Sequence, residues 1–277
     1  MSITSPLAVT SLHIYPVKSC TGVALSESLV GRMGLRYDRQ WAFVDDTGMF
    51  VAQRDSRGLG VPVRTLCLIG TVIDERLLTL TAPGIAPLHV PATGVAGPSV
   101  PVRVWDSRTS GVDQGADAAA WATEVLSRER PGRYRLVRMA DATHRRSKIG
   151  DGELAYGDAY PFLVISEESL ADLNQRMPAP LPMNRFRPNV VIAGGTPYVE
   201  DTLDRCRIGT VDLFGATLCI RCPIPTTDQR TGERGKEPLR TLATYRKQPD
   251  GVVFGRNFNH AGTGVMRVGD PVVVASE

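Results

Sequence analysis

Apolar and polar residues alternate in short runs along most of the chain, which is the pattern of half-buried β-strands. Clusters that contain Gly, Pro and Asp separate many of the runs and indicate turns between them. Single strands are expected over residues 12–16, 100–105, 134–139, 162–165, 189–193 and 266–274. Paired strands are expected over residues 40–53, 76–90 and 207–222. The pattern therefore predicts a strand-rich fold.

The paired strands contain sequences that favour a reversal of the chain. Residues 40–53 include Asp45-Asp46-Thr47-Gly48, which is a hairpin signal. Residues 76–90 include Pro83-Gly84, which is also typical of a turn. Residues 207–222 are expected to turn about Phe214-Gly215.

Three segments have helical patterns. Residues 115–130 are rich in Ala and place several apolar side chains on one face. A second helix is expected after Ser166, which is a favourable N-cap, and it should continue to about Arg176. Pro238 is suited to the first turn of a short third helix.

The chain has 277 residues, which at about 150 residues per domain allows one large domain or two ordinary ones. It contains 27 Gly and 20 Pro, so many turns are expected and an all-helical bundle is excluded. Arg130-Pro131-Gly132 ends the first helix and is the preferred boundary, which gives domains at 1–131 and 132–277. We expect a mixed, β-rich (α+β) protein with at least one small barrel.

Charge and cysteine content narrow the class of protein further. The formal net charge is +3, too mild to make nucleic acid or an anionic membrane the main partner. No apolar run approaches 18 residues, and the first ten residues lack the features of a secretory signal. The five cysteines are an odd number, so a disulfide framework is not expected. A cytoplasmic location is the expectation that follows.

The strongest local candidate for chemistry is the segment Cys219-Ile220-Arg221-Cys222. It could be half of a zinc site, a redox pair or two packed cysteines, and the chain has no second CxxC to complete a zinc site. In a regular strand Cys219 and Cys222 would face opposite ways. Arg221 should favour the thiolate of Cys222, and a thiolate is a soft metal ligand or a carrier of sulfur.

Two further segments carry groups that bind anions. Lys18 and Ser19 directly follow the first expected strand, where an exposed Lys is the alternative interpretation. Arg187 and Asn189 precede a buried strand, and guanidiniums suit phosphate while an amide suits the edge of a heterocycle. Ordinary surface arginines are the alternative there.

Taken together, the ordered motifs resemble the MOSC family, named for the C-terminal domain of molybdenum cofactor sulfurase. The chain is most similar to the branch that has an N-terminal MOSC β-barrel domain and includes the mitochondrial amidoxime reducing components. The motifs are YPVKSCTG at 15–22, DRQW at 38–41, FLVISEESLADLN at 162–174, FRPNVVIAG at 186–194, CIRCPIPTTDQRTG at 219–232, KEPLRTLATYR at 236–246 and VGDPVVV at 268–274. The resemblance covers roughly residues 9–275 and implies an N-terminal β-barrel-like domain packed on a C-terminal MOSC β-barrel.

The resemblance implies a molybdenum cofactor, in which a pyranopterin holds the metal and a protein cysteine adds a ligand. Cys222 matches that cysteine and is the expected metal ligand, and Asp158 matches an acid near the metal. These two are the expected catalytic residues, with Asp158 positioning the substrate or relaying a proton. The expected cofactor-binding residues are Lys18, Ser19, Arg39, Arg187, Asn189 and Arg221. Ala159 and Tyr160 replace hydroxyl residues of the mitochondrial type, and Ile220 replaces a small residue, which changes the expected contacts to the cofactor.

The function that the resemblance implies is reduction of N-hydroxylated small molecules by molybdenum. The chain has no cysteine set for an iron–sulfur cluster and no dinucleotide fingerprint, so a separate donor of the ferredoxin or flavodoxin type is expected. The alternative is a sulfur carrier that holds a persulfide on Cys222, delivered by a PLP-dependent cysteine desulfurase. A third hypothesis is a non-catalytic protein that stores the cofactor.

Overall fold

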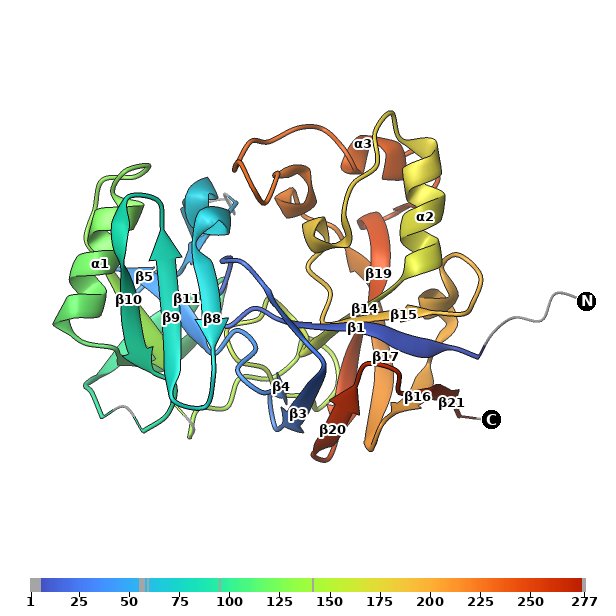
Figure 1. The fold of residues 1–277 in the computed structure, drawn as a ribbon, viewed down its shortest axis with the longest axis horizontal. Coiled ribbons are helices and arrows are strands. Elements are labelled where there is room, and N and C mark those ends of the chain that lie inside the picture. Colours follow the sequence, from blue (N-terminus) through green and yellow to red (C-terminus); the bar gives the residue numbers. More distant parts are fainter. Residues whose placement is uncertain (1–5, 55–57, 59, 95, 141, 276–277) are drawn as a thin grey trace, which may run out of the picture.

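The computed structural model describes residues 6–54, 58, 60–94, 96–140 and 142–275. They form two lobes that lie side by side, and the first strand runs into the lobe built mainly from the second half of the chain (Figure 1). The fold is mixed and β-rich, as expected. Among the described residues, no helix has the length and apolar character needed to span a bilayer.

The larger sheet forms the second lobe. Its strands follow the order β2-β1-β15-β14-β19-β17-β16-β21, and β18 pairs with β19 at the side. The bounds are β1 (Ala8–Ile14), β2 (Val23–Leu25), β14 (Phe162–Ser166), β15 (Val190–Ala193), β16 (Arg205–Ile208), β17 (Val211–Ile220), β18 (Lys247–Gln248), β19 (Gly251–Ala261) and β21 (Val272–Val274). The only parallel pair along this path is β14 with β15; the other neighbours are antiparallel.

Backbone hydrogen bonds from both ends of the chain close this sheet on itself. The Val9 amide donates to the Asp270 carbonyl at 2.9 Å, and the Gly269 amide donates to the Val9 carbonyl at 2.8 Å. The Val272 amide donates to the Leu7 carbonyl at 2.8 Å. Since strand β1 also pairs with β15, it is one of the strands of the barrel that the second half of the chain forms.

Smaller sheets form the first lobe. They have the orders β10-β9-β8, β11-β12-β13-β5 and β6-β7, and the sheet β20-β3-β4 joins segments from both halves of the chain. The bounds are β3 (Glu27–Gly31), β4 (Gly34–Leu35), β5 (Trp41–Asp45), β6 (Val51–Ala52), β7 (Val61–Pro62), β8 (Gly70–Ile73), β9 (Leu77–Ala82), β10 (Ile85–Pro91), β11 (Ser99–Val104), β12 (Ser107–Asp113), β13 (Tyr134–Met139) and β20 (Gly264–Arg267). The hairpin expected over residues 76–90 is confirmed as β9 and β10.

The helices are α1 (Ala116–Leu126), α2 (Glu167–Arg176) and α3 (Leu239–Leu242). Helix α2 begins as expected, because the Ser166 hydroxyl accepts a hydrogen bond from the Ser169 amide. Helix α1 packs against β13 and β10 with the apolar face that its sequence pattern indicated. Short 3-10 turns cover Arg64–Leu68 (η1), Met183–Arg185 (η2), Val199–Thr202 (η3) and Ile224–Thr226 (η4).

The expectation of a turn at Phe214-Gly215 is wrong. The chain reverses at Gly209, where φ is +57° and a Cβ would lie 2.3 Å from the Val265 carbonyl oxygen. Gly215 instead lies inside β17, where a Cβ would lie 2.6 Å from the Arg256 guanidinium. This glycine therefore marks a close side-chain approach next to a register shift rather than a turn.

The last expected strand, over residues 266–274, is also corrected. It is two strands, β20 and β21, separated by a turn at which the Arg267 amide donates to the Asp270 carboxylate at 2.7 Å. Gly269 has φ +93° in that turn. The apolar pattern continued across the turn, so periodicity alone did not reveal it.

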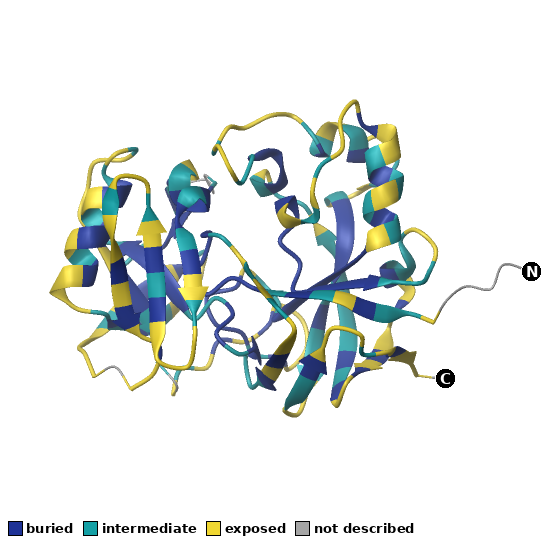
Figure 2. Cartoon of the chain, in the orientation of Figure 1, coloured by how far each residue is buried: buried dark blue, intermediate teal, exposed yellow. Residues whose placement is uncertain are grey.

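One buried apolar cluster runs through both lobes. It contains Trp41 and Trp121 of the first lobe as well as Ile192 and Phe258 of the second. Buried segments accordingly continue across the junction between the lobes (Figure 2). The shared core fixes the lobes relative to each other, so loops at their junction can build one site.

Candidate functional site

The sequence-predicted residues come from loops that meet where the two lobes join. Backbone hydrogen bonds tie these loops together: the Arg39 amide donates to the Tyr15 carbonyl at 2.9 Å, and the Tyr156 amide donates to the Arg39 carbonyl at 2.9 Å. The His13 amide donates to the Asn189 carbonyl at 2.8 Å. The loop after β1 is thus fastened to the loops before β5, β14 and β15.

Three of the predicted residues have a left-handed backbone. Ser19, Arg39 and Arg187 have φ values of 70°, 50° and 57°, although none is glycine. Such conformations cost about 1–3 kcal/mol each and cluster at functional sites, where the surroundings impose them. Strain at three of the expected cofactor-binding residues supports a functional site here.

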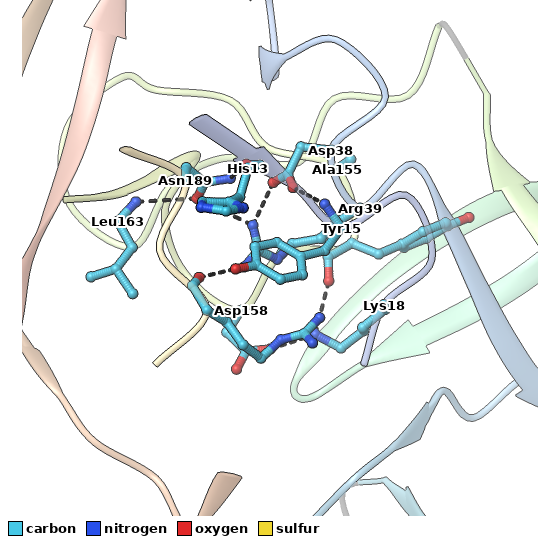
Figure 3. A network of polar contacts seen from close by, with 12 residues as sticks. His13, Tyr15, Lys18, Asp38, Arg39, Ala155, Asp158, Leu163 and Asn189 are labelled. Carbon is cyan, nitrogen blue, oxygen red and sulfur yellow. Dashed lines mark hydrogen bonds and ion pairs between the residues drawn. The ribbon is translucent and has the colours of Figure 1, made fainter. Parts of the chain in front are cut away.

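Two guanidiniums lie against one buried phenol ring. The Arg187 and Arg39 guanidinium carbons are 4.1 Å and 4.7 Å from the ring centre of Tyr15. Arg187 also donates to the Cys20 carbonyl at 2.7 Å. Figure 3 shows Arg39, Tyr15 and Asn189 within one polar network. We call Tyr15, Arg39, Arg187 and Asn189 the guanidinium cradle.

Burial and charge act in opposite directions on the cradle. Burial lowers the pKa of Arg187, while for Arg39 the Asp38 carboxylate outweighs burial and raises the pKa. Burial raises the pKa of Tyr15 to about 12, so this ring remains a neutral phenol. The cradle therefore presents two positive charges, one of them balanced by Asp38.

Asn189 is engaged with the protein itself. Its side-chain oxygen accepts hydrogen bonds from Arg39 and from the Leu163 amide, both at 3.2 Å. Its side-chain nitrogen donates to the His13 carbonyl at 3.3 Å. These contacts orient Arg39 and join β14 to the loop before β15, and a direct contact of Asn189 with a pterin stays a prediction.

Lys18 and Asp158 form an ion pair on the other side of the site. The Lys18 ammonium also donates to the Tyr156 carbonyl at 2.9 Å, and only 6% of its side chain is exposed. Burial lowers the pKa of Lys18 to about 8, against the opposing effect of Asp158. Arg145 donates to the Asp158 carbonyl at 3.2 Å and so fixes the loop that carries this acid.

Arg54 and Trp105 complete this side and were missed by the sequence analysis. The indole N–H of Trp105 donates to Asp158 at 3.2 Å, and Arg54 lies 3.8 Å from the same carboxylate. Although burial alone would raise the pKa of Asp158, Lys18, Arg54 and Trp105 hold it below its ordinary value. We call Lys18, Arg54, Trp105 and Asp158 the carboxylate edge.

The thiol of Cys222 lies within the electrostatic influence of this edge. Burial raises the pKa of Cys222, while the guanidiniums of Arg54 and Arg221 lower it. Arg221 favours the thiolate, as expected, but burial outweighs its charge and the pKa of Cys222 is raised. A soft metal ion would displace the thiol proton on binding.

Cys219 differs from Cys222 in its contacts. It packs against a separate cluster of buried residues that includes Phe186 and Phe254. Its sulfur accepts a hydrogen bond from Arg221 at 3.2 Å. Arg221 in turn donates to the Phe186 carbonyl at 2.8 Å. Arg221 thus joins Cys219 to the loop before β15 and acts on Cys222 through its charge alone.

The donor set fits a cofactor that brings its own metal ligands. Among the described residues, no group of three or more His, Cys, Asp or Glu side chains is placed to hold a metal ion. The buried Nε atoms of Arg54 and Arg221, both near Cys222, make no hydrogen bond. One thiol beside two unused cationic donors suits an anionic, metal-carrying ligand.

The residues that depart from the family pattern lie at different depths. The Tyr160 hydroxyl is buried without a hydrogen-bond partner, and the Ala159 carbonyl accepts from the Lys148 amide at 3.1 Å. Ile220 is 50% exposed. Their effect on the cofactor stays a prediction.

Fold and site together define a two-domain MOSC protein. A model of the MOSC N-terminal beta barrel domain matches residues 7–129, and a model of the MOSC domain matches residues 151–273. The expected boundary at residue 131 lies between these matches and stays a prediction.

Sequence similarity to known proteins identifies the branch of the family to which the chain belongs. It is 37% identical to mitochondrial amidoxime-reducing component 1 of Mus musculus, over 97% of this chain and 82% of the mouse protein. The human component 1 is 36% identical over 97% of this chain and 83% of its own length. Component 2 of Rattus norvegicus is 35% identical over 95% of this chain and 82% of its own length. The chain belongs to the MOSC family, in the branch of the amidoxime-reducing components.

Proposed function

We propose that this protein is a molybdenum-cofactor-dependent reductase that converts N–OH groups of small molecules to N–H. The observation that carries the proposal is the buried thiol of Cys222 under the influence of the Arg54 and Arg221 guanidiniums, whose Nε atoms have no hydrogen-bond partner among the described residues, in a chain whose relatives are named for amidoxime reduction. The reaction consumes two electrons and two protons and releases water. When bound, the cofactor supplies the two-electron chemistry.

The roles of the protein groups follow from their chemistry. Cys222 would bind the metal, and the cations of the site would hold the pterin and its phosphate. The residues proposed to hold this anionic part are Lys18, Ser19, Arg39, Arg187 and Arg221, with Asn189 orienting Arg39. Burial of these cations would strengthen each contact, because little water competes with the ligand.

Asp158 is proposed to orient the substrate. Its lowered pKa keeps the carboxylate ionised at neutral pH, so it accepts hydrogen bonds and does not donate a proton. Its side chain is 47% exposed, which leaves part of the carboxylate accessible from outside. An amidoxime carries N–H and O–H donors that this carboxylate could bind.

Electrons are proposed to come from a separate protein of the ferredoxin or flavodoxin type. Such encounters use small, weak interfaces, and the net charge of +3 suits an acidic donor. Charge-guided docking weakens as salt rises. We propose that the protein works in the cytoplasm, where a reducing environment would keep Cys222 available.

The test uses the whole chain produced in a host that makes the cofactor. We expect molybdenum by elemental analysis and pterin by fluorescence after oxidation. Benzamidoxime should be reduced with dithionite or reduced viologen, and with a protein donor in a salt-sensitive manner. NAD(P)H alone should give no product, and turnover with NAD(P)H as the only reductant would overturn the proposed route of electrons.

A sulfur carrier is the second candidate, because Arg54 and Arg221 would also stabilise a persulfide anion on Cys222. A PLP-dependent cysteine desulfurase would then transfer one sulfur atom to this thiol. Intact-mass measurement after incubation with a desulfurase and cysteine tests this function. A sulfur adduct on Cys222 in protein that lacks molybdenum and amidoxime turnover would favour the carrier.

A further inference from the structure

Trp105 occupies a turn that is poorly suited to a large residue. Val104 pairs with Ser107, so Trp105 and Asp106 alone connect β11 to β12. Trp105 has φ 54°. A two-residue hairpin turn with positive φ at its first position normally has glycine there. A bulky residue in this conformation points to a constraint outside the turn.

The contacts of the indole identify that constraint. Its N–H donates to the Asp158 Oδ1 atom at 3.2 Å, and the Arg54 guanidinium carbon lies 4.1 Å from its ring centre. The ring of Phe50 meets it edge-on at 4.5 Å, and the Lys18 ammonium lies 5.7 Å from the ring centre. Trp105 therefore contacts every other member of the carboxylate edge.

The other two tryptophans serve the core. Trp41 and Trp121 are 0% and 7% exposed, and their indole N–H groups donate to Gln114 and to the Ala86 carbonyl. Trp105 is half-buried and donates instead to an ionised carboxylate. Trp105 also packs against a buried cluster that includes Phe50, but this packing does not account for the hydrogen bond of its N–H to Asp158.

We propose that Trp105 is a positioning residue that acts through Asp158 and Arg54, so that the first lobe completes the active site. Asp158 Oδ1 accepts from both Lys18 and Trp105, and the Oδ2 atom faces Arg54 at 3.8 Å. With Oδ1 held, the carboxylate has one orientation and offers its exposed side to a substrate. This inference rests on the proposed function.

The kinetic test compares Trp105→Gly and Trp105→Phe with the matched core control Trp121→Phe. Glycine accepts the backbone conformation without strain, and phenylalanine keeps the ring but lacks the N–H donor. At equal molybdenum and pterin content, we expect Trp105→Gly to lower kcat/KM for benzamidoxime with dithionite by about tenfold or more. Trp105→Phe should lie between this variant and wild type, and Trp121→Phe should match wild type. The unfolding temperature of Trp105→Gly should stay near that of wild type.

A double-mutant cycle tests whether Trp105 acts through Asp158. Trp105→Gly should cost little further activity in an Asp158→Asn background, because the group it positions is already altered. Independent, multiplying losses would overturn the inference, as would wild-type kcat/KM in Trp105→Gly.

A cofactor-free measurement gives a second readout. The three indole N–H signals can be resolved by ¹⁵N NMR, and the Trp105 signal is assigned by its loss in Trp105→Phe. Asp158→Asn should shift the Trp105 signal and leave those of Trp41 and Trp121 in place. If wild type reduces no amidoxime, the proposed function fails, and this signal alone decides whether Trp105 is held by Asp158. An unshifted Trp105 signal overturns the inference.

Discussion

The guanidinium cradle and the carboxylate edge face the same site but are built differently. In the cradle, Arg39 and Arg187 are enclosed by Tyr15 and hold protein acceptors already. At the edge, Asp158 is 47% exposed and is held by residues from both lobes. Rigid, buried cations suit the retention of a ligand, whereas a half-exposed carboxylate suits contact with molecules that exchange. The comparison therefore assigns retention of the cofactor to the guanidinium cradle and turnover of the substrate to the carboxylate edge.

The largest effect is expected at Cys222, because this residue is the proposed metal ligand and both cofactor binding and substrate turnover require the metal. Cys222→Ser should abolish activity, because a hydroxyl is too hard and too weakly acidic to replace a thiolate. Cys219→Ser is the matched control and should retain most activity, since Cys219 packs against a separate cluster. Dithionite-driven reduction of benzamidoxime measures both variants. A dead Cys219→Ser variant, or equal dependence on both cysteines, would contradict this assignment.

Asp158→Asn is expected to give the next largest effect and to act on turnover alone. The amide keeps the size of the side chain but removes the charge that is proposed to orient substrate. We expect about a hundredfold loss of kcat/KM, at the upper end of what losing a charge-assisted hydrogen bond of about 1.5–3 kcal/mol gives. Molybdenum and pterin content should equal those of wild type. A loss of cofactor in this variant would show that the edge also holds the ligand.

Arg187→Ala should have the converse effect on the cradle. Losing a charge-assisted hydrogen bond of about 1.5–3 kcal/mol weakens binding about tenfold to a hundredfold. Lys18→Ala should also lower pterin content, although Lys18 lies at the edge, because the family resemblance assigns it to the cofactor. Pterin fluorescence measures occupancy, and circular dichroism checks that the variants fold. Full occupancy in both variants would show that the anionic part binds elsewhere.

The smallest effect is an opposite response to alkaline pH of two buried groups, Lys18 of the carboxylate edge and Cys67, which lies within the electrostatic influence of Arg187 in the cradle. The pKa of Lys18 is lowered to about 8 from an ordinary 10.5, so stability should rise with pH between these values as the folded protein releases this proton first. Burial raises the pKa of Cys67 from 9.0 to about 11, against the opposing effect of the Arg187 charge. Its contribution is present below pH 9.0 and is lost as pH approaches about 11.

Substitutions at these two residues separate the responses. Each group contributes up to about 1.4 kcal/mol of unfolding free energy per pH unit. Lys18→Met should remove the rise, and Cys67→Ala should remove part of the fall. Urea unfolding of the cofactor-free chain across this range measures both. Profiles parallel to that of wild type would contradict the pKa directions.

Much of the fold follows from the local sequence pattern, and the errors in its prediction come from contacts between residues distant in sequence. The hairpin at Pro83-Gly84 and the cap at Ser166 were predictable because turn chemistry and capping act within a few residues. Gly215 was misread, because its lack of a side chain serves Arg256, which is distant in sequence. The closure of the barrel by β1 was not predictable for the same reason, since nothing near Val9 reveals its distant partner Asp270.

The candidate site likewise has residues that could be predicted from the sequence and residues that could not. Arg39, Arg187 and Asn189 of the cradle were found because the motifs around them resemble those of a family, whereas Tyr15 was not singled out. Trp105 and Arg54 were missed, because their significance lies in contacts with Asp158 across the two lobes. No signal for this turn was available in the sequence, because the next strand, Ser107–Asp113, carries a single apolar side chain, Val112, and was not expected.

The closure of the barrel has a consequence for synthesis on the ribosome. Strand β1 emerges early, but its partners on one side are Gly269 and Asp270, which are made about 260 residues after Val9. At about 5–20 residues per second, the strand waits on the order of tens of seconds before the barrel can close. During that time its backbone is an unpaired strand edge, open to pairing with another chain. The risk of aggregation therefore persists until Gly269 and Asp270 have been made, and it is set by the order in which the strands of the barrel are made.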